Sequence, residues 1–237
     1  MALPIVLLHA FPLSSRMFEP LRAKLSGVDL ITPDYAASSS LDALADDVAA
    51  LLDDREVDGA IIGGVSMGGY LTMAFLRRHR SRAAAVVLAD TKAGADCDDA
   101  RANRLRIAQA LDDEGTSRVL LDEVLPTLIG PTTMRERPGV VDFVTQLVAA
   151  ASPKSAAGWE RAMAARPDSL EILRSLDVPA LVIVGAEDVL VSSEQARAMA
   201  DALPHSRLVE LPAAGHLSVV ETPGAFAAVL KDFAESR

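Results

Sequence analysis

Residues 61–69, Ile-Ile-Gly-Gly-Val-Ser-Met-Gly-Gly, form the segment that decides the fold. They place a G-x-S-x-G motif, centred on Ser66, between an apolar run and an amphipathic stretch that continues to Arg80. A sharp turn from strand to helix holds such a serine in a strained conformation and exposes its hydroxyl at the carboxyl edge of a sheet. Gly64 and Gly68 omit side chains that would collide in this turn, and the following helix N-terminus offers N–H groups to a developing oxyanion. The motif predicts that Ser66 is a nucleophile.

Short apolar runs bounded by Gly, Pro and Asp recur along the chain and predict six strands. They are continuously apolar rather than alternating, which is typical of strands covered on both faces. Amphipathic stretches lie between them, one of them beginning after Ser40, a suitable N-cap. The alternation predicts an α/β fold with a doubly wound, mainly parallel sheet. The predicted strands are 5–8, 29–32, 60–65, 84–89, 180–184 and 207–210.

One long interval breaks this alternation. Between Asp90 and Pro179 the sequence shows only helical segments, near 97–114, 116–129, 139–151 and 155–165, punctuated by prolines. We therefore predict a core domain of residues 1–92 and 178–237, with a helical lid inserted at 93–177.

Composition narrows the classes of function. A chain of 237 residues suits one domain with an insertion, and its net charge of −10 argues against nucleic acid and anionic membranes as partners. The acidic runs 96–99 and 112–114 are interpreted as solvated helix faces. The single cysteine, Cys97, permits no internal disulfide. With no membrane-spanning stretch and no signal-peptide pattern in the sequence, we expect a cytoplasmic protein.

A serine nucleophile needs a base, and His216 is the best placed of four histidines. It lies in a loop between the last predicted strand and the last predicted helix, where open α/β sheets carry their sites. His79 and His205 are interpreted as surface residues, and His9 closes the first strand.

The base in turn needs an acid to orient it. Asp188 follows the fifth predicted strand and preserves the chain order Ser, Asp, His. Glu187 is expected to point away from the site. Asp90, at the end of the fourth strand, remains the rival, because an acid there could also reach the histidine.

With these residues in place, the chain resembles the α/β-hydrolase superfamily over essentially its whole length. Within it, the chain is similar to lidded carboxylesterases and 3-oxoadipate enol-lactonases. The resemblance implies that the first two strands lie on one side of the Ser66 strand, and that the backbone N–H groups of Phe11 and Met67 form an oxyanion hole. The family usually has glycine where this chain has Ala10, a residue that resists some of the backbone angles open to glycine.

The predicted reaction is hydrolysis of a small carboxylic ester or lactone through an acyl-enzyme, with no metal or organic cofactor. Three lid residues are candidates for substrate binding: Trp159 could pack on an apolar or ring-shaped substrate, and Arg135 or Arg161 could receive a carboxylate. Cofactor-free haloperoxidase or perhydrolase chemistry and carbon–carbon bond hydrolysis remain open, since both use the same triad. A signalling receptor that binds its ligand with slow or no turnover is the alternative from another class.

Overall fold

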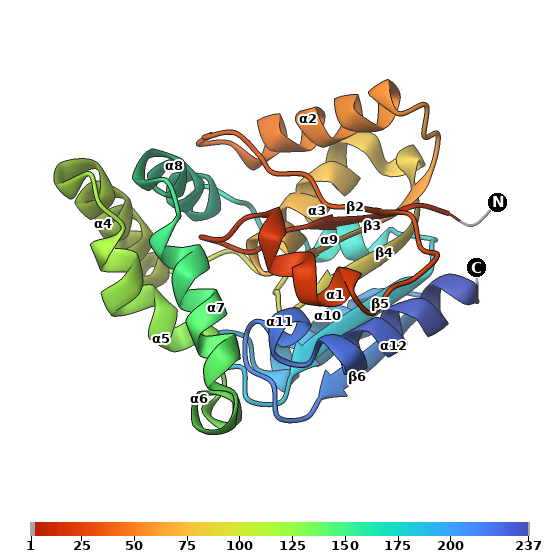
Figure 1. Ribbon diagram of the computed structural model, residues 1–237. Helices are drawn as coiled ribbons and strands as arrows, with labels where there is room; N and C mark the ends of the chain where they lie inside the picture. Colours follow the sequence, from red (N-terminus) through yellow and green to blue (C-terminus); the bar gives the residue numbers. More distant parts are fainter. Residues whose placement is uncertain (1–2, 237) are drawn as a thin grey trace.

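The computed structural model describes residues 3–236, which contain a six-stranded, all-parallel sheet (Figure 1). The strands lie in the order β2-β1-β3-β4-β5-β6. This confirms the predicted α/β fold and sheet, since each predicted strand overlaps an observed one. The strands are β1 (Ile5–Leu8), β2 (Leu30–Ile31), β3 (Ala60–Val65), β4 (Ala83–Ala89), β5 (Ala180–Gly185) and β6 (Ser206–Leu211).

The strand order reverses direction beside β1. The chain steps outward from β1 to β2, returns past β1 to β3, and then continues to β6 at the far edge. β1 and β2 therefore lie on one side of β3, as the resemblance implies. Ligands of doubly wound sheets bind outside the carboxyl ends of the strands at such a reversal, here between β1 and β3.

Helices cover both faces of the sheet (Figure 1). Because crossovers between parallel strands are right-handed, the change of direction places α1, which joins β1 to β2, on the face opposite α2 and α3. One layer holds α2 (Leu41–Asp54), α3 (Met67–His79), α9 (Leu170–Arg174) and α10 (Ser193–Ala202), and the other holds α1 (Glu19–Arg22), α11 (Ser218–Glu221) and α12 (Pro223–Glu235).

Local sequence signals account for these elements. Every residue of β1 and β3 is buried, as their continuous apolar runs predict, whereas only Leu211 of the edge strand β6 is buried. The Ser40 hydroxyl caps α2 by accepting a hydrogen bond from the N–H of Ala43, and Ser192 and Gln195 form a capping box at α10.

The helices of residues 98–164 gather beyond the carboxyl ends of the strands, at the left of Figure 1. They are α4 (Asp98–Glu114), a π-helical turn (Leu120–Val124) leading into α5 (Leu125–Leu128), α6 (Pro131–Glu136), α7 (Pro138–Ala149) and α8 (Pro153–Ala164). α4 packs along α8. Within residues 3–236, no helix is both long and apolar enough to span a bilayer.

Candidate active site

Ser66 occupies the turn between β3 and α3, in a conformation that is strained for a residue with a side chain. Its φ of 56° and ψ of −114° lie in the positive-φ region, at a cost of about 1–3 kcal/mol that the surrounding structure must offset. Neighbouring bonds hold it there: the Ser66 N–H donates to Ala89 O (2.9 Å), and Thr91 Oγ1 donates to Ser66 O (2.9 Å). The predicted strand–turn–helix context of Ser66 is present.

The two glycines of the motif are required for space. A Cβ on Gly64 would lie 2.1 Å from the carbonyl carbon of Gly68, and a Cβ on Gly68 would lie 2.0 Å from Leu8 O. Both distances are far inside van der Waals contact and involve backbone atoms. The turn can therefore close against β1 only with glycine at these positions.

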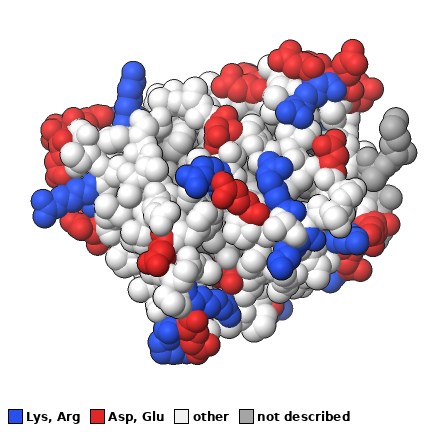
Figure 2. Space-filling view, in the orientation of Figure 1, with Lys and Arg blue, Asp and Glu red and all other residues white. Residues whose placement is uncertain are grey.

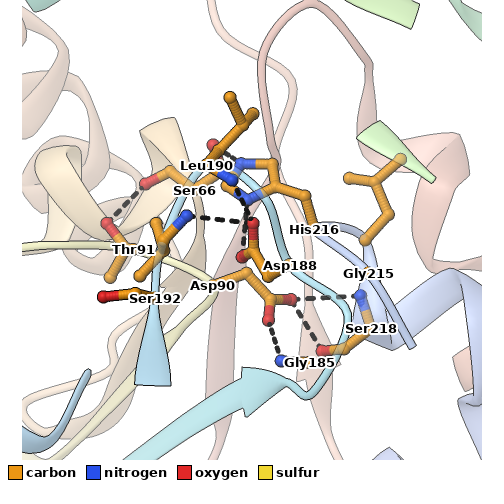
Figure 3. Close-up of polar contacts among 12 residues, drawn as sticks. Ser66, Asp90, Thr91, Gly185, Asp188, Leu190, Ser192, Gly215, His216 and Ser218 are labelled. Carbon is orange, nitrogen blue, oxygen red and sulfur yellow. Dashed lines mark hydrogen bonds and ion pairs between the residues drawn. The ribbon is translucent and has the colours of Figure 1, made fainter. Parts of the chain in front are cut away.

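Three side chains from separate loops form one hydrogen-bonded chain (Figure 3). His216 Nδ1 lies 2.8 Å from Asp188 Oδ2, and His216 Nε2 lies 2.7 Å from Ser66 Oγ. An ionised carboxylate only accepts hydrogen bonds, so Nδ1 carries the proton and Nε2 accepts from the serine hydroxyl. The structure thus brings together the serine, histidine and aspartate selected from the sequence.

The electrostatic surroundings of His216 strengthen it as a base. Burial of the imidazole lowers the pKa of His216, but the hydrogen bond to Asp188, with the charges of Asp188 and Glu221, outweighs this effect, so that the pKa is raised above 6.5. A raised pKa means that the ring holds a proton more readily once it has accepted one.

The loop after β5 fixes Asp188 and turns its neighbour elsewhere. Asp188 Oδ1 accepts hydrogen bonds from the N–H groups of Leu190 (2.8 Å) and Val191 (3.0 Å), which leaves Oδ2 for His216. Glu187 points away from His216, as expected, and accepts from the N–H and hydroxyl of Thr132.

Asp90, the rival acid, is fully buried but bonds to other partners. Its Oδ1 accepts from Gly185 N–H (3.0 Å), and its Oδ2 accepts from the N–H (3.1 Å) and hydroxyl (2.6 Å) of Ser218. Gly185 precedes the Asp188 loop and Ser218 follows His216, so Asp90 joins the two loops from below (Figure 3). The hydrogen-bond partner of His216 is Asp188.

Burial and the charge of Asp188 raise the pKa of Asp90 to about 8, against the opposing effects of His216, Ser218 and Gly185. In the folded state Asp90 therefore keeps a proton that the unfolded chain releases near its ordinary value of 3.8. The tighter proton binding of folded Asp90 stabilises the fold. This stabilisation is complete below pH 3.8 and is lost as the pH rises toward about 8.

We expect the difference in unfolding free energy between the wild type and Asp90→Asn to change across this window by at most about 1.4 kcal/mol per pH unit, with the wild type losing stability as the pH rises. Urea denaturation of both proteins at several pH values between 4 and 9 measures it. A pH-independent difference would contradict the assignment of a raised pKa to Asp90.

The two predicted oxyanion donors have free N–H groups. Among the described residues, neither Phe11 nor Met67 donates a backbone hydrogen bond, and both lie next to Ser66, Met67 in sequence and Phe11 as a lining residue of the same cavity. Ala10, where the family has glycine, is not among the described residues with positive φ. The departure from glycine therefore imposes no backbone strain.

The structure places the three predicted lid residues outside the cavity that contains Ser66. Trp159 is buried against the rings of His9 and Tyr35, and its indole N–H donates to Ala36 O (3.1 Å). It therefore packs α8 onto the loops after β1 and β2. Arg135 is exposed and pairs with Glu136, and Arg161 pairs with Asp112 on the surface between α8 and α4.

The cavity beside Ser66 has a volume of about 290 Å³ and a wall that the sequence analysis missed. Asp96, interpreted above as part of a solvated acidic run, is instead buried and lines this cavity together with Lys92, Arg104 and Glu160. That interpretation of Asp96 was wrong because its main partner lies far along the chain: Arg166, 70 residues away, donates to both of its oxygens. On the outer surface, by contrast, acidic and basic side chains are interspersed, with acidic groups gathered over α2 (Figure 2).

Glu221, another buried carboxylate, fastens the helical segment of residues 98–164 to the His216 loop. Glu221 Oε1 accepts from the N–H groups of Gly215 (2.9 Å) and Leu217 (3.2 Å), and Glu221 Oε2 accepts from Gly130 N–H (2.9 Å). Gly130 is the N-cap of α6, whereas Gly215 and Leu217 flank His216. Arg137 adds to this connection by donating to Ala213 O and Glu221 O. Nothing in the sequence around Glu221 indicated this role.

The described residues contain no group of three or more His, Cys, Asp or Glu side chains that could hold a metal ion.

Three comparisons place the chain among known proteins. The Alpha/beta hydrolase family matches residues 5–229. The chain is 31% identical to 3-oxoadipate enol-lactonase 2 of Acinetobacter baylyi over 198 residues, which are 81% of this chain and 72% of the relative.

Two solved structures extend the likeness to the whole chain. A thermophilic esterase from Thermogutta terrifontis superposes with a TM-score of 0.96 and 34% identity, covering 100% of this chain and 90% of the esterase. The enol-lactonase of Burkholderia xenovorans LB400 gives a TM-score of 0.88 and 27% identity, covering 99% and 92%. With its fold, its serine turn and its homologues in agreement, the chain belongs to the Alpha/beta hydrolase family.

Proposed function

We propose that this hydrolase cleaves a small carboxylic ester or lactone, with Ser66, His216 and Asp188 as a catalytic triad. The observation that carries the proposal is the unbroken hydrogen-bonded chain from Asp188 through His216 to Ser66, at the strained turn and beside a cavity. The similarity to an esterase and to two enol-lactonases supports the choice of bond.

In the proposed mechanism the first half-reaction forms an acyl-enzyme. His216 Nε2 takes the hydroxyl proton of Ser66 as Oγ attacks the carbonyl carbon, and Asp188 holds the imidazole in the required tautomer and stabilises its cation. The N–H groups of Phe11 and Met67 stabilise the oxyanion. His216 then gives its proton to the leaving alkoxide, and Ser66 remains acylated.

In the second half-reaction His216 removes a proton from water, which attacks the acyl carbon and releases the acid. A lactone follows the same steps, except that its leaving alkoxide stays attached to the acyl group. Residues 93–177 act in this scheme as a lid over the core formed by 1–92 and 178–237, because α4 and α8 supply much of the cavity wall.

The bond class is tested with p-nitrophenyl esters of graded acyl length, assayed beside a panel of lactones. We expect hydrolysis of short acyl esters, of lactones or of both. Peroxide-dependent halogenation in acetate buffer, without ester or lactone hydrolysis, would favour the haloperoxidase alternative. Tight stoichiometric binding without product would favour a receptor.

The pH dependence follows from the raised pKa of His216. The base must be neutral to accept the Ser66 proton, so kcat/KM should rise with pH through an apparent pKa above 6.5 and then level. In Asp188→Asn the hydrogen bond to a carboxylate and the negative charge are both absent, so the remaining activity should titrate at a lower pH. Measuring kcat/KM from pH 5 to pH 9 tests this, and an unshifted profile in the variant would argue against the assigned pair.

A further inference from the structure

The loop after β1 spans residues 9–15 and carries the N–H of Phe11, one of the two proposed oxyanion donors. This Phe11 loop ends at Ser15, where a short helical turn begins. The donor serves an oxyanion only while the loop keeps its place, because a misplacement of about 1 Å can cost about a hundredfold in rate. The bond from Ala10 N–H to Met17 Sδ (3.2 Å) is local. The Phe11 loop therefore depends on anchors elsewhere in the fold.

The segment after β2 anchors both ends of the Phe11 loop. At the start of the loop, the hydroxyl of Tyr35 donates to His9 O (2.7 Å). At its end, Asp34 Oδ1 accepts from the N–H of Ser15 (2.6 Å), and Asp34 Oδ2 accepts from the Ser15 hydroxyl (2.9 Å). Two consecutive residues thus hold the loop on either side of the donor.

The first of these anchors lies against the serine turn. A Cβ on Gly68 would be 3.0 Å from His9 O, so the end of β1 and the first turn of α3 are in close contact there. The other proposed donor, the N–H of Met67, belongs to that first turn. The bond from Tyr35 to His9 O therefore fixes the Phe11 loop at the point where it meets the second donor.

The same segment, residues 34–38, also binds α8 and lies beside it (Figure 1). The indole N–H of Trp159 donates to Ala36 O (3.1 Å), and a Cβ on Gly158 would lie 2.9 Å from Ser38 O. Glycine at 158 therefore lets the helix approach the segment closely. One segment thus holds both the Phe11 loop and a helix that supplies part of the cavity wall.

The rings of His9, Tyr35 and Trp159 pack together where these contacts meet. His9 stacks on Tyr35 with ring centroids 3.8 Å apart, and Trp159 meets the two rings edge-on at 5.5 and 5.9 Å. His9 Nε2 is buried and has no hydrogen-bond partner among residues 3–236. Burial lowers the pKa of His9 to about 4, so its ring is uncharged at neutral pH. The three rings therefore join the Phe11 loop, the segment and α8 through packing.

We propose that Asp34 and Tyr35 are positioning residues for the oxyanion donor Phe11, and that Trp159 holds them in place from α8 rather than contacting substrate. The inference rests on the proposed function, since it concerns the oxyanion of that reaction. None of these three side chains lines the Ser66 cavity, so each acts on the transition state through the Phe11 loop.

The first test is Tyr35→Phe, which keeps the ring and removes only the bond to His9 O. We expect kcat for the best ester or lactone to fall about tenfold, part of the loss of about 10²–10³ that follows removal of a whole donor, with KM changed less than about twofold. Asp34→Ala removes the other anchor from a side chain that is 62% exposed, and should act in the same direction.

Ser206→Ala on β6 is the matched control. Its hydroxyl donates to Ala200 O at 2.7 Å, a bond of the same kind far from the Phe11 loop, and its loss should leave kcat at the wild-type value. Rates are expressed per site labelled by a fluorophosphonate probe. A merely structural role of Tyr35 or Asp34 would lower the melting temperature and the number of labelled sites, but not kcat per labelled site.

Binding of butylboronic acid reports on the oxyanion hole without turnover. Ser66 Oγ bonds to boron, His216 takes the hydroxyl proton, and the anionic tetrahedral adduct resembles the transition state. In calorimetric titrations, we expect Tyr35→Phe and Asp34→Ala to bind the boronic acid about tenfold more weakly than the wild type, in step with the fall in kcat.

Trp159→Phe separates a positioning role from substrate contact. It keeps an aromatic ring and loses the N–H that binds Ala36 O. We expect kcat and boronate affinity to fall together by about threefold, with KM unchanged. A residue in contact with substrate would instead raise KM.

The outcomes are distinct. Cleavage that depends on Ser66, with kcat per labelled site and boronate affinity unchanged in both Tyr35→Phe and Asp34→Ala, overturns the inference and leaves the proposed function standing. A fall in kcat with unchanged boronate affinity overturns it as well, because the loss then does not arise at the oxyanion. Weaker boronate binding in both variants, with no ester or lactone cleaved by the wild type, overturns the proposed function and leaves the positioning role standing.

Discussion

Ser66→Ala should lower kcat for the best ester or lactone by about 10⁵–10⁶-fold and abolish labelling by a fluorophosphonate probe. The size follows from the role of the triad as a unit, since removing the nucleophile costs about as much as removing all of its members. Among residues 3–236 the hydroxyl bonds only to His216 Nε2. Its loss should therefore leave the fold intact, with circular dichroism and thermal unfolding close to those of the wild type.

The control for this variant is a serine of similar burial outside the site. Ser169 is buried and accepts a hydrogen bond from Arg77, and Ser169→Ala should retain both probe labelling and turnover. Ester hydrolysis by Ser66→Ala at more than about one per cent of the wild-type rate would contradict the assignment of Ser66 as nucleophile.

Asp188→Asn should lower kcat by about 10⁴-fold, whereas Asp90→Asn should lower it by less than about tenfold. An asparagine at 188 can present its amide nitrogen to His216 Nδ1 and so favour the wrong tautomer, with Nε2 protonated and unable to accept the serine proton. Asp90 makes no hydrogen bond to His216 and reaches it only through the loops that it joins.

Since Asp90→Asn changes buried hydrogen bonds, its rate should be expressed per folded active site, counted by titration with the fluorophosphonate probe. The double variant Asp90→Asn/Asp188→Asn adds a check. Its kcat should be lower than that of Asp188→Asn by no more than the small factor that Asp90→Asn causes alone. A loss of about 10⁴-fold in Asp90→Asn per labelled site would instead make Asp90 the acid.

The sequence was most informative where structure depends on neighbours along the chain. The runs 5–8 and 60–65 are apolar throughout because both faces of those strands are covered, and Ser66 lies between glycines because the turn has no room for a Cβ. Loop positions after strands also identified His216 and Asp188, since the carboxyl ends of parallel strands share one edge.

The wall of the cavity depends on contacts that no local pattern reports. The position of Asp96 in an acidic run favoured solvent exposure, yet Arg104 and Arg166 draw it into the interior. Arg135 and Arg161 were equally good candidates by composition, but each has a surface partner on its own or a neighbouring helix. Trp159 contacts His9 and Tyr35, more than 120 residues earlier. Pairings of this kind are set by tertiary packing.

The bonds of Glu221 have a consequence for how small molecules enter and leave. Lifting the Gly130 end of the helical segment would break a buried hydrogen bond on the same carboxylate that holds the backbone on both sides of His216. Entry or exit of small molecules beside Gly130 would therefore loosen the backbone around His216 during each turnover. Leu190 lines the cavity and is 42% exposed, so we expect small molecules to enter and leave on its side. Residence times of products should accordingly depend on the bulk of residue 190.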